Sequence, residues 1–174
     1  PRFFLVDPLD GTKAFVRGDP NFTVNIGLIE DGRPVAGAVC APPSGEVWYT
    51  SGSGVMKRTG VGAAHAVHVR PWPHDAAVAL ISHTMKPETA DKLAEEYGFH
   101  LREPMDSSIK LCRIAEGMAD IYPRHGPTME WDTAAGHAVL EAAGGRYTTP
   151  EGELFIYGKA DQGFRNGWFV ARGG

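Results

Sequence analysis

The first part of the chain alternates hydrophobic and polar positions in short runs, a pattern typical of β-strands. Arg2–Val6 is the first expected strand, and Phe22–Ile29 is the second. The dipeptide Asp31-Gly32 then favours a type I′ turn, which would bring Pro34–Cys40 back beside the second strand. Two further strands are expected at Val47–Thr50 and Val55–Arg58. The pattern therefore predicts an antiparallel meander.

Beyond residues 65–69 the pattern changes to strands that alternate with helices. The continuous apolar run Ala76–Ser82 predicts a strand covered on both faces. Pro87–Tyr97 has helical spacing, and Gly98 after it is a typical helix stop. A helical turn is expected at Lys13–Val16, strands at Phe99–Arg102 and Ala119–Tyr122, and a helix at Trp131–Ala143. A further helix is expected to be capped by Ser107 or Ser108 and to carry Leu111, Cys112, Ala115 and Met118 on one face. We therefore expect an α/β fold in two parts, with the meander in residues 1–70 and an α/β arrangement in residues 71–174.

The composition restricts the classes of function. With 174 residues, of which 43% are hydrophobic, the chain is long enough to bury a sizeable core. The formal net charge of -4 argues against a nucleic-acid-binding surface. The sequence has neither a recognisable signal peptide nor a run of about 18 apolar residues. Cys40 and Cys112 lie in apolar stretches, and we expect them to be free thiols in a reducing cytoplasm.

Two carboxylates stand close together where the first strand ends. Asp7 and Asp10 would repel each other there unless a cation compensates them. If the chain turns between them, both can face one pocket, and the Leu9 carbonyl can add a third oxygen for a hard cation such as Mg²⁺. The backbone amides of Gly11 and Thr12 can bind a phosphate. The alternative is an ordinary Asx turn in which Asp10 caps a helix.

Asp132 is a second candidate, because it stands where a helix is expected to begin and where free amides favour a carboxylate. The small residues Thr133–Gly136 that follow would let a ligand or another backbone come near. The alternative is a plain helix start with a tightly packed small face.

A third candidate site combines a helix start with a basic turn. The hydroxyls of Ser107 and Ser108 stand at the helix start, and Lys110 follows on the same helix. Together with Arg124 from the turn, these groups can hold an anion. The alternative is a capped helix and a solvated turn. We expect His125 to be structural or exposed rather than a metal ligand.

The motifs, in this order, resemble those of a known superfamily. DPLDGT at residues 7–12 and WDTAAG at residues 131–136 resemble the lithium-sensitive, magnesium-dependent phosphatases, which include inositol monophosphatases, fructose-1,6-bisphosphatases and 3′(2′),5′-bisphosphate nucleotidases. The stretches FTVNIGLIEDGRPVAGAV, SSIKLCRIAEGMADIYPRHGPT and EWDTAAGHAV look most like the bacterial 3′(2′),5′-bisphosphate nucleotidases. The resemblance extends from Pro1 to about Arg172 and implies an α+β layered sandwich of the inositol monophosphatase type.

The resemblance implies a role for each matching residue. The metal ligands, for two or more Mg²⁺ ions, would be Asp7, Asp10, Asp132 and the Leu9 carbonyl. Gly11 and Thr12 would bind the scissile phosphate, and the Thr12 hydroxyl would orient the attacking water. The nucleotide would contact Ser107, Ser108, Lys110, Tyr122 and Arg124. Inhibition by Li⁺ is expected from the same resemblance.

The implied reaction is metal-assisted hydrolysis of the 3′-phosphate of adenosine 3′,5′-bisphosphate, which yields AMP and phosphate and serves sulfate assimilation. The alternatives are an inositol phosphate or histidinol phosphate as substrate, or a non-catalytic remnant that binds Mg²⁺ or nucleotide without turnover. The implied partner is a small nucleotide rather than nucleic acid, in a cytoplasmic protein without stable membrane insertion. The resemblance allows a homodimer and a peripheral association with the inner membrane.

The sequence departs from the resembled pattern at several positions. Ala14 replaces a usually acidic residue, and Asp106 replaces the glycine that usually precedes the double serine. His83 lacks the usual basic-serine-histidine order and receives no role. The upstream glutamates of the family would lie before Pro1. We therefore expect the chain to correspond to the C-terminal two-thirds of such a protein and to be a poor enzyme by itself.

Overall fold

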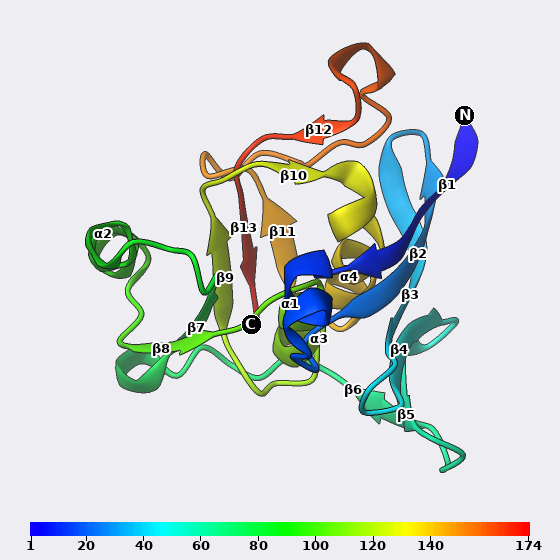
Figure 1. Ribbon diagram of the computed structural model, residues 1–174, viewed down its shortest axis with the longest axis horizontal. Helices are drawn as coiled ribbons and strands as arrows, with labels where there is room; N and C mark the ends of the chain where they lie inside the picture. The colour runs from blue at the N-terminus through cyan, green and yellow to red at the C-terminus, as the bar shows by residue number, and fades with distance from the viewer.

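The computed structural model describes residues 1–174 and contains two main β-sheets with helices between and beside them (Figure 1). The first sheet has six strands that pair in chain order, and every pair is antiparallel. Its strands are β1 (Arg2–Asp10), β2 (Thr23–Glu30), β3 (Arg33–Ala41), β4 (Glu46–Ser51), β5 (Gly54–Thr59) and β6 (His65–Val67). The predicted meander is therefore confirmed.

The turn between β2 and β3 is the one that its dipeptide predicts. Asp31 has a φ of 49° and Gly32 a φ of 78°, so both central residues are in the left-handed region. A type I′ turn requires this conformation, and its twist matches that of the two strands. The hairpin aligns Glu30 with Arg33 and Ile29 with Pro34, and the register then shifts by one residue at Leu28, which pairs with Ala36.

The second sheet has five strands in the order β11-β13-β9-β7-β8. β7 pairs in parallel with β8 and β9, whereas the other pairs are antiparallel. The strands are β7 (Val78–Ile81), β8 (Leu101–Pro104), β9 (Ile121–Arg124), β11 (Arg146–Thr148) and β13 (Phe169–Arg172), and a separate pair is formed by β10 (Thr128–Met129) and β12 (Arg165–Asn166). The mixed α/β arrangement predicted for this part is confirmed, while the division at residue 70 stays a prediction.

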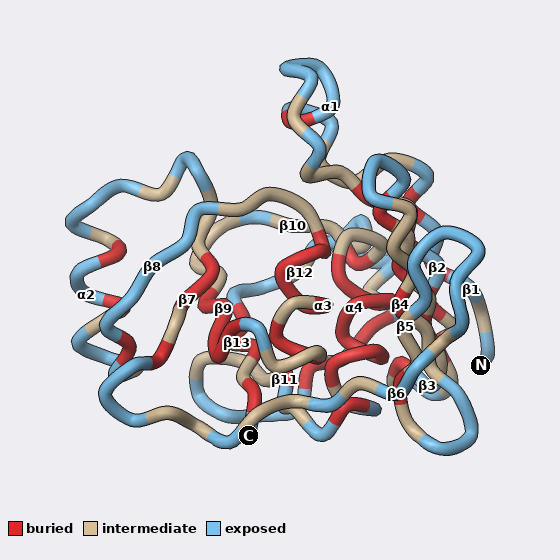
Figure 2. Tube along the Cα trace, turned by 90° about the horizontal axis from the view of Figure 1, so that it is seen from below, coloured by how far each residue is buried: buried red, intermediate tan, exposed pale blue.

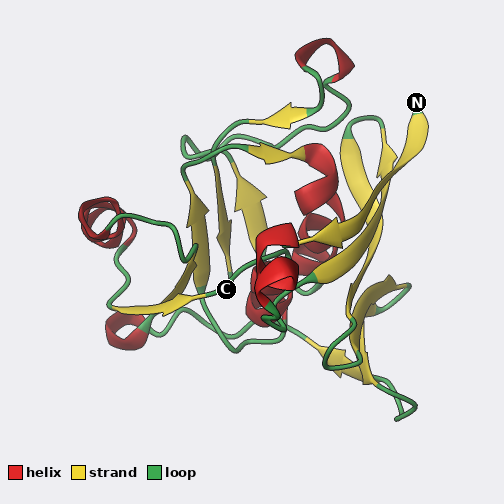
Figure 3. Cartoon of the chain, in the orientation of Figure 1, coloured by secondary structure: helices red, strands yellow, loops and turns green.

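The helices form layers with the two sheets (Figure 3). The helices are α1 (Thr12–Arg17), α2 (Pro87–Tyr97), α3 (Ile109–Ala115) and α4 (Glu130–Ala142), with short 3-10 helices at His74–Ala76 and Ala160–Gln162. α3 and α4 lie between the sheets, and α2 covers the outer face of the second sheet. None of the helices combines the length and the apolar character needed to cross a bilayer.

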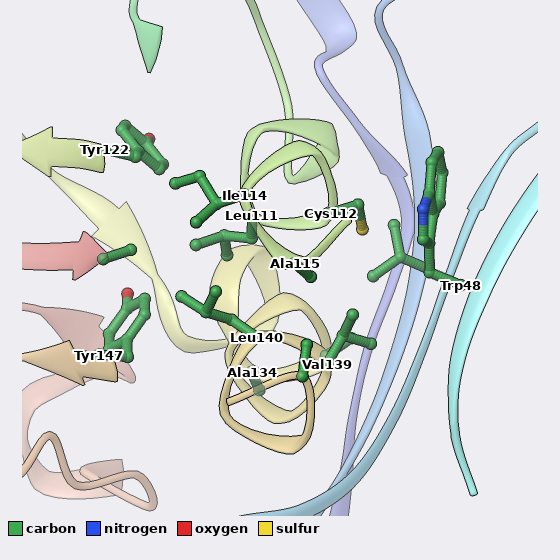
Figure 4. Close-up of a cluster of buried hydrophobic side chains, with 14 of the residues drawn as sticks. Trp48, Leu111, Cys112, Ile114, Ala115, Tyr122, Ala134, Val139, Leu140 and Tyr147 are labelled. Atoms are coloured by element: carbon green, nitrogen blue, oxygen red, sulfur yellow. The ribbon is translucent and has the colours of Figure 1, made fainter. Parts of the chain in front are cut away.

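Burial is concentrated around α3 and α4 (Figure 2). Figure 4 shows Leu111 and Cys112 of α3 beside Val139 of α4, in a core that reaches Trp48 of the first sheet. On β7, Leu80 belongs to this core while its neighbour Ala79 packs toward α2. The prediction that this strand is covered on both faces is therefore confirmed.

Both cysteines are free thiols, as predicted. Cys112 is buried within the central core, whereas Cys40 on β3 is half-buried.

Two glycines allow α4 to lie against the first sheet at short range. A Cβ atom on Gly37 would lie 2.4 Å from the Ala135 carbonyl oxygen, and one on Gly27 would lie 2.9 Å from the Ala135 amide nitrogen. Both obstacles are backbone atoms, which cannot move aside as a flexible side chain can. The close approach holds the first turn of α4 near the end of β1.

Several predicted boundaries are wrong by a few residues. β1 continues to Asp10 instead of ending at Val6, because an irregularity lets pairing resume after Asp7. α3 ends at Ala115, since Gly117 adopts a φ of 76° that breaks the helix, and Met118 is therefore 66% exposed rather than on the buried face. The strands expected at Phe99–Arg102 and Ala119–Tyr122 are shifted by two residues, to Leu101–Pro104 and Ile121–Arg124.

Candidate active site

Three carboxylates from two elements meet at one point. Asp7 and Asp10 lie on β1, and Asp132 lies in the first turn of α4. Each offers one oxygen, and these three oxygens lie within 4.8 Å of one another. The structure thus brings together the three aspartates that the two motifs supply. A set of carboxylate oxygens this close fits a hard divalent cation such as Mg²⁺.

A local irregularity in β1 places two of these carboxylates on the same face. In a regular strand, residues three apart point to opposite faces of the sheet. Here Asp7 pairs with Asn25 and Asp10 with Thr23, so three steps on β1 match two steps on β2. The extra residue is a bulge, which re-aims one side chain. Both aspartates therefore point to the side on which α4 packs.

Asp7 and Asp10 also make hydrogen bonds to nearby backbone amides, and these bonds test the Asx-turn and helix-cap alternatives. The Leu9 amide donates to Asp7 Oδ1 over 3.0 Å, which is an Asx turn. Asp10 does not cap α1, because the cap position belongs to Gly11 and no side chain bonds there. Asp10 Oδ2 instead accepts the Ser108 amide at 2.6 Å, a bond that joins β1 to the start of α3.

The start of α4 is held by two acidic residues. Asp132 Oδ2 accepts the Met129 amide at 2.7 Å, so one oxygen serves the helix end. The neighbouring Glu130 is fully buried, accepts the amides of Gly158 and Lys159, and pairs with Lys159 Nζ at 2.7 Å. Sequence reasoning gave Glu130 no role, because its partners lie in an irregular segment. These contacts fix the turn from which Asp132 reaches the cluster.

The electrostatics of the cluster favour a bound cation. Burial raises the pKa of Asp10 to about 6, with a further rise from the charge of Asp7, although the Ser108 amide opposes it. Burial also raises the pKa of Asp132 to about 7, and the charges of Asp10 and Asp7 add to the rise. Keeping these groups ionised without a cation is unfavourable.

We expect Mg²⁺ to stabilise the protein more strongly at about pH 8 than at about pH 5. Raised pKa values mean that, without metal, the native state binds more protons than the unfolded chain between about pH 4 and pH 7, so stability falls as the pH rises through that window. A cation reverses this loss where the carboxylates are ionised. The measurement is the Tm in EDTA and in Mg²⁺ across this range. A Tm difference that does not change with pH would contradict the expectation.

A cavity of about 280 Å³ lies beside the carboxylate cluster. Asp10 and Asp132 line it, whereas Asp7 and Leu9 do not. Gly11 lines it as well, with a φ of 82°, and a Cβ there would lie 2.8 Å from the Asn21 carbonyl oxygen, so this position requires glycine. The backbone can therefore come close to a group bound in the cavity.

The serines at the start of α3 are placed differently from one another. Ser108 occupies the cap position, yet its hydroxyl makes no capping bond. It donates instead to Asn25 Oδ1 over 2.7 Å and lies 2.8 Å from the Thr23 hydroxyl. Ser108 therefore holds the predicted cap position without the expected bond, because buried polar groups of β2 bind its hydroxyl. Ser107 Oγ accepts the Ile109 amide at 3.4 Å. Ser107 has a φ of 60° and also lines the cavity.

The basic residues of the third candidate site also line the cavity. Lys110 is buried, its Nζ donates to the Met105 carbonyl over 3.1 Å, and it lies 4.2 Å from the centre of the Tyr122 ring. Arg124 donates to the Pro127 carbonyl over 3.3 Å and has no carboxylate partner. His125 stacks on Trp168 at 4.6 Å and is not part of the carboxylate cluster. All the predicted site residues except Asp7 and Leu9 thus border one cavity, and their roles stay predictions.

Three further residues of the cavity received no role from the sequence. Arg17 Nη2 donates to Asp106 Oδ2 over 2.7 Å, and His83 Nδ1 lies 3.3 Å from the same oxygen. All three line the cavity. The aspartate at position 106, where the resembled pattern has glycine, was the one feature of the sequence that could have pointed to this group. Nothing in the sequence links Arg17 to Asp106, which is 89 positions away.

The chain has close relatives among proteins of known name. A model of the inositol monophosphatase family matches residues 1–169. The 3′(2′),5′-bisphosphate nucleotidase CysQ of Salmonella typhimurium is 42% identical over 156 residues, which are 90% of this chain and 62% of that protein. CysQ of Escherichia coli is 42% identical over 160 residues, with the same coverage. The chain thus spans about 62% of the length of these relatives.

Solved structures show the same fold. The crystal structure of CysQ from Bacteroides thetaiotaomicron matches with a TM-score of 0.86 and 35% identity, over 99% of this chain and 70% of that one. An inositol monophosphatase from Zymomonas mobilis matches with a TM-score of 0.81 at 23% identity, over 98% of this chain and 65% of that one. The second likeness concerns the fold alone.

Proposed function

The chain belongs to the inositol monophosphatase family, and we propose that it carries most of the active site of a magnesium-dependent phosphatase. The proposed substrate is adenosine 3′,5′-bisphosphate, which would lose its 3′-phosphate to give AMP and phosphate. The observation that carries this proposal is the carboxylate cluster of Asp7, Asp10 and Asp132 beside a cavity lined by basic side chains. The choice of nucleotide is supported by 42% identity to proteins named CysQ.

The metal site would be formed by the three aspartates, with the Leu9 carbonyl as a further oxygen and two or more Mg²⁺ ions in place. Bound there, Mg²⁺ supplies Lewis-acid polarisation of the phosphate and lowers the pKa of a water molecule. The chain supplies the geometry. The β1 bulge aims Asp7 and Asp10, and the first turn of α4 brings Asp132 opposite them.

Gly11 and Thr12 are the proposed binders of the scissile phosphate. Gly11 has no side chain to block an approach to the backbone, and both residues line the cavity. The Thr12 hydroxyl donates to the Leu9 carbonyl over 3.3 Å. The lone pairs of the Thr12 hydroxyl oxygen are left to accept a hydrogen bond from a water molecule, which would orient that water toward the phosphate.

The rest of the nucleotide would lie among the other lining residues. Arg124 carries a charge that no carboxylate compensates, so it is available to an anion or to the face of a base. Lys110 and Tyr122 are buried and form one wall of the cavity, and Ser107 offers a hydroxyl.

The free thiols support a reducing, cytoplasmic location. Inhibition by Li⁺, a homodimer and peripheral membrane association stay predictions from the resemblance.

Phosphate release from competing substrates tests the proposal. In the natural protein that contains this chain, we expect kcat/KM with Mg²⁺ to be at least about tenfold higher for adenosine 3′,5′-bisphosphate than for inositol 1-phosphate or histidinol phosphate, a difference of about 1.4 kcal/mol in transition-state binding. An Asp132→Asn variant shows whether the release belongs to this site. Preference for either other substrate would overturn the nucleotide assignment.

A further inference from the structure

A stripe of polar side chains runs along one face of α4. Thr133, His137 and Glu141 are spaced four residues apart, so they lie one above the other on the same side of the helix. Thr133 and His137 are buried, whereas Glu141 is half-buried in the last turn. Thr133 also lines the cavity of the candidate active site. The stripe therefore extends from that cavity to the opposite end of the helix.

The hydroxyl of Tyr157 joins the two buried members of the stripe. It lies 3.0 Å from His137 Nδ1 and 3.2 Å from the Thr133 hydroxyl. On the other side of the imidazole ring, Nε2 lies 3.0 Å from Glu141 Oε1. Arg33 Nη2 donates to the same carboxylate over 3.3 Å. These side chains thus form one continuous series of polar contacts through the core.

The two ends of this series fix the direction of its hydrogen bonds. The Glu141 carboxylate only accepts, so it favours a proton on His137 Nε2 and leaves Nδ1 to accept the Tyr157 hydroxyl. At the cavity end, Asn166 Nδ2 donates to the Thr133 oxygen over 2.9 Å, so the Thr133 hydroxyl can donate to Tyr157. Burial lowers the pKa of His137 even though Glu141 opposes the shift, and the ring is therefore neutral at neutral pH. A charged ring would have no acceptor for Tyr157.

Asp132 stands between two residues of α4 that are held by the segment around Tyr157. Glu130 accepts the two backbone amides that follow Tyr157, at 2.8 and 2.9 Å. Thr133 contacts the Tyr157 hydroxyl, and this contact is shorter than its 3.5 Å bond to the Glu130 carbonyl. The Tyr157 amide donates to the Gly32 carbonyl over 3.0 Å, in the turn between β2 and β3. The first turn of α4 is thereby tied to the first sheet, whose first strand carries the other two carboxylates.

Support at this point matters because the three carboxylates of the cluster repel one another without a cation. Such repulsion pushes the first turn of α4, which carries Asp132, away from Asp7 and Asp10. We propose that His137 and Tyr157 are positioning residues for the metal site. The neutral imidazole accepts the Tyr157 hydroxyl, and the bonds ordered in this way hold Asp132 where it can share a cation with the other two aspartates. The identity of the ion as Mg²⁺ rests on the proposed function.

A calorimetric titration of the natural protein with Mg²⁺, at slightly alkaline pH, tests this role without turnover. His137→Phe keeps a ring in place but removes the acceptor of the Tyr157 hydroxyl, and it is expected to bind Mg²⁺ about tenfold more weakly than the parent protein. Tyr157→Phe removes the hydroxyl itself and is expected to bind Mg²⁺ about fivefold more weakly. The double variant is expected to bind no more weakly than His137→Phe, because it removes the unpaired hydroxyl as well.

Val139→Ala is the matched control. Val139 is fully buried two residues after His137, on the opposite side of α4, in the core that reaches Trp48 (Figure 4). Its truncation is expected to lower the Tm and to change the Mg²⁺ affinity by no more than about twofold. If Val139→Ala weakened Mg²⁺ binding as much as His137→Phe does, or if the losses of the two phenylalanine variants added up in the double variant, the proposal would be overturned. If His137→Phe does not fold, Tyr157→Phe compared with Val139→Ala carries the same test.

The protonation state of the imidazole gives a readout that stability alone does not move. The ¹⁵N chemical shifts of His137 at neutral pH are expected to show a proton on Nε2 and none on Nδ1. A proton on Nδ1 would reverse the bond to Tyr157 and overturn the proposal. A protein whose variants behave as described, yet which releases no phosphate from adenosine 3′,5′-bisphosphate with Mg²⁺, would refute the proposed function and leave the positioning role standing.

Discussion

Replacing Asp10 with asparagine is expected to lower kcat about 100-fold or more while raising the Tm in EDTA. The variant loses a charged oxygen ligand for a hard cation, which weakens both metal binding and activation of water. It also loses an ionised group whose pKa is raised to about 6 by burial, so the metal-free fold at pH 7.5 becomes more stable. The amide oxygen of asparagine can still accept the Ser108 amide. The measurements are phosphate release at saturating Mg²⁺ and thermal unfolding in EDTA.

The control for this prediction is Asp161→Asn. Asp161 is exposed in a short 3-10 helix and has no ion-pair partner, so the same loss of charge should leave both quantities unchanged. Near-normal turnover in Asp10→Asn would exclude Asp10 as a metal ligand. A lower Tm in EDTA would mean that its carboxylate supports the fold instead of straining it.

Gly37→Ala is expected to destabilise the native state by about 3 kcal/mol and to lower the Tm by roughly 10 °C. The new methyl group would lie 2.4 Å from the Ala135 carbonyl oxygen and 3.0 Å from the Ala138 side chain. Because the first obstacle is helix backbone, α4 has to move away from β3. The same displacement would shift Asp132 from the other carboxylates, so Mg²⁺ affinity should fall as well.

Gly52→Ala provides the comparison. No atom lies within 4 Å of the Cβ position at Gly52, and its φ is not in the left-handed region. Its free energy of unfolding should change by no more than about 0.5 kcal/mol. If both variants unfolded at the same temperature, the close contact between α4 and the first sheet would have no energetic consequence.

The elements that could be predicted from the sequence are those fixed by local chemistry. α2 has the predicted bounds, Pro87–Tyr97, because proline suits the first helical position and Gly98 ends the helix with a φ of 70°. β10, β11, β12 and β13 were not predicted. β10, β11 and β12 have only two or three residues and are too short to show a periodic pattern. Their existence depends on partners distant in the chain.

Some features of the candidate site could likewise be predicted from the sequence, and others could not. The close spacing of Asp7 and Asp10 predicted a shared cation. Asp132 was joined to them only through the resemblance of the two motifs to the phosphatase superfamily, and the structure brings all three together. The bulge that aims Asp7 and Asp10 to one side could not be seen, since it depends on the pairing with β2. The contacts of Arg17 and His83 with Asp106 were missed for a similar reason, because they form only when the end of α1 and the segments after β7 and β8 meet at the cavity.

Because α4 lies between the two sheets, a metal ion bound to Asp132 would also affect the stability of the fold. Asp132 stands on this central helix, whereas Asp7 and Asp10 stand on the first strand. An ion bound to all three would connect two segments that lie far apart in the sequence. Because the three carboxylates come together only in the native state, the ion binds that state alone and stabilises it by its binding free energy. Amide hydrogen exchange in β1 and in the first turn of α4 should therefore slow together when Mg²⁺ binds. The ion would then stabilise the fold as well as take part in the reaction.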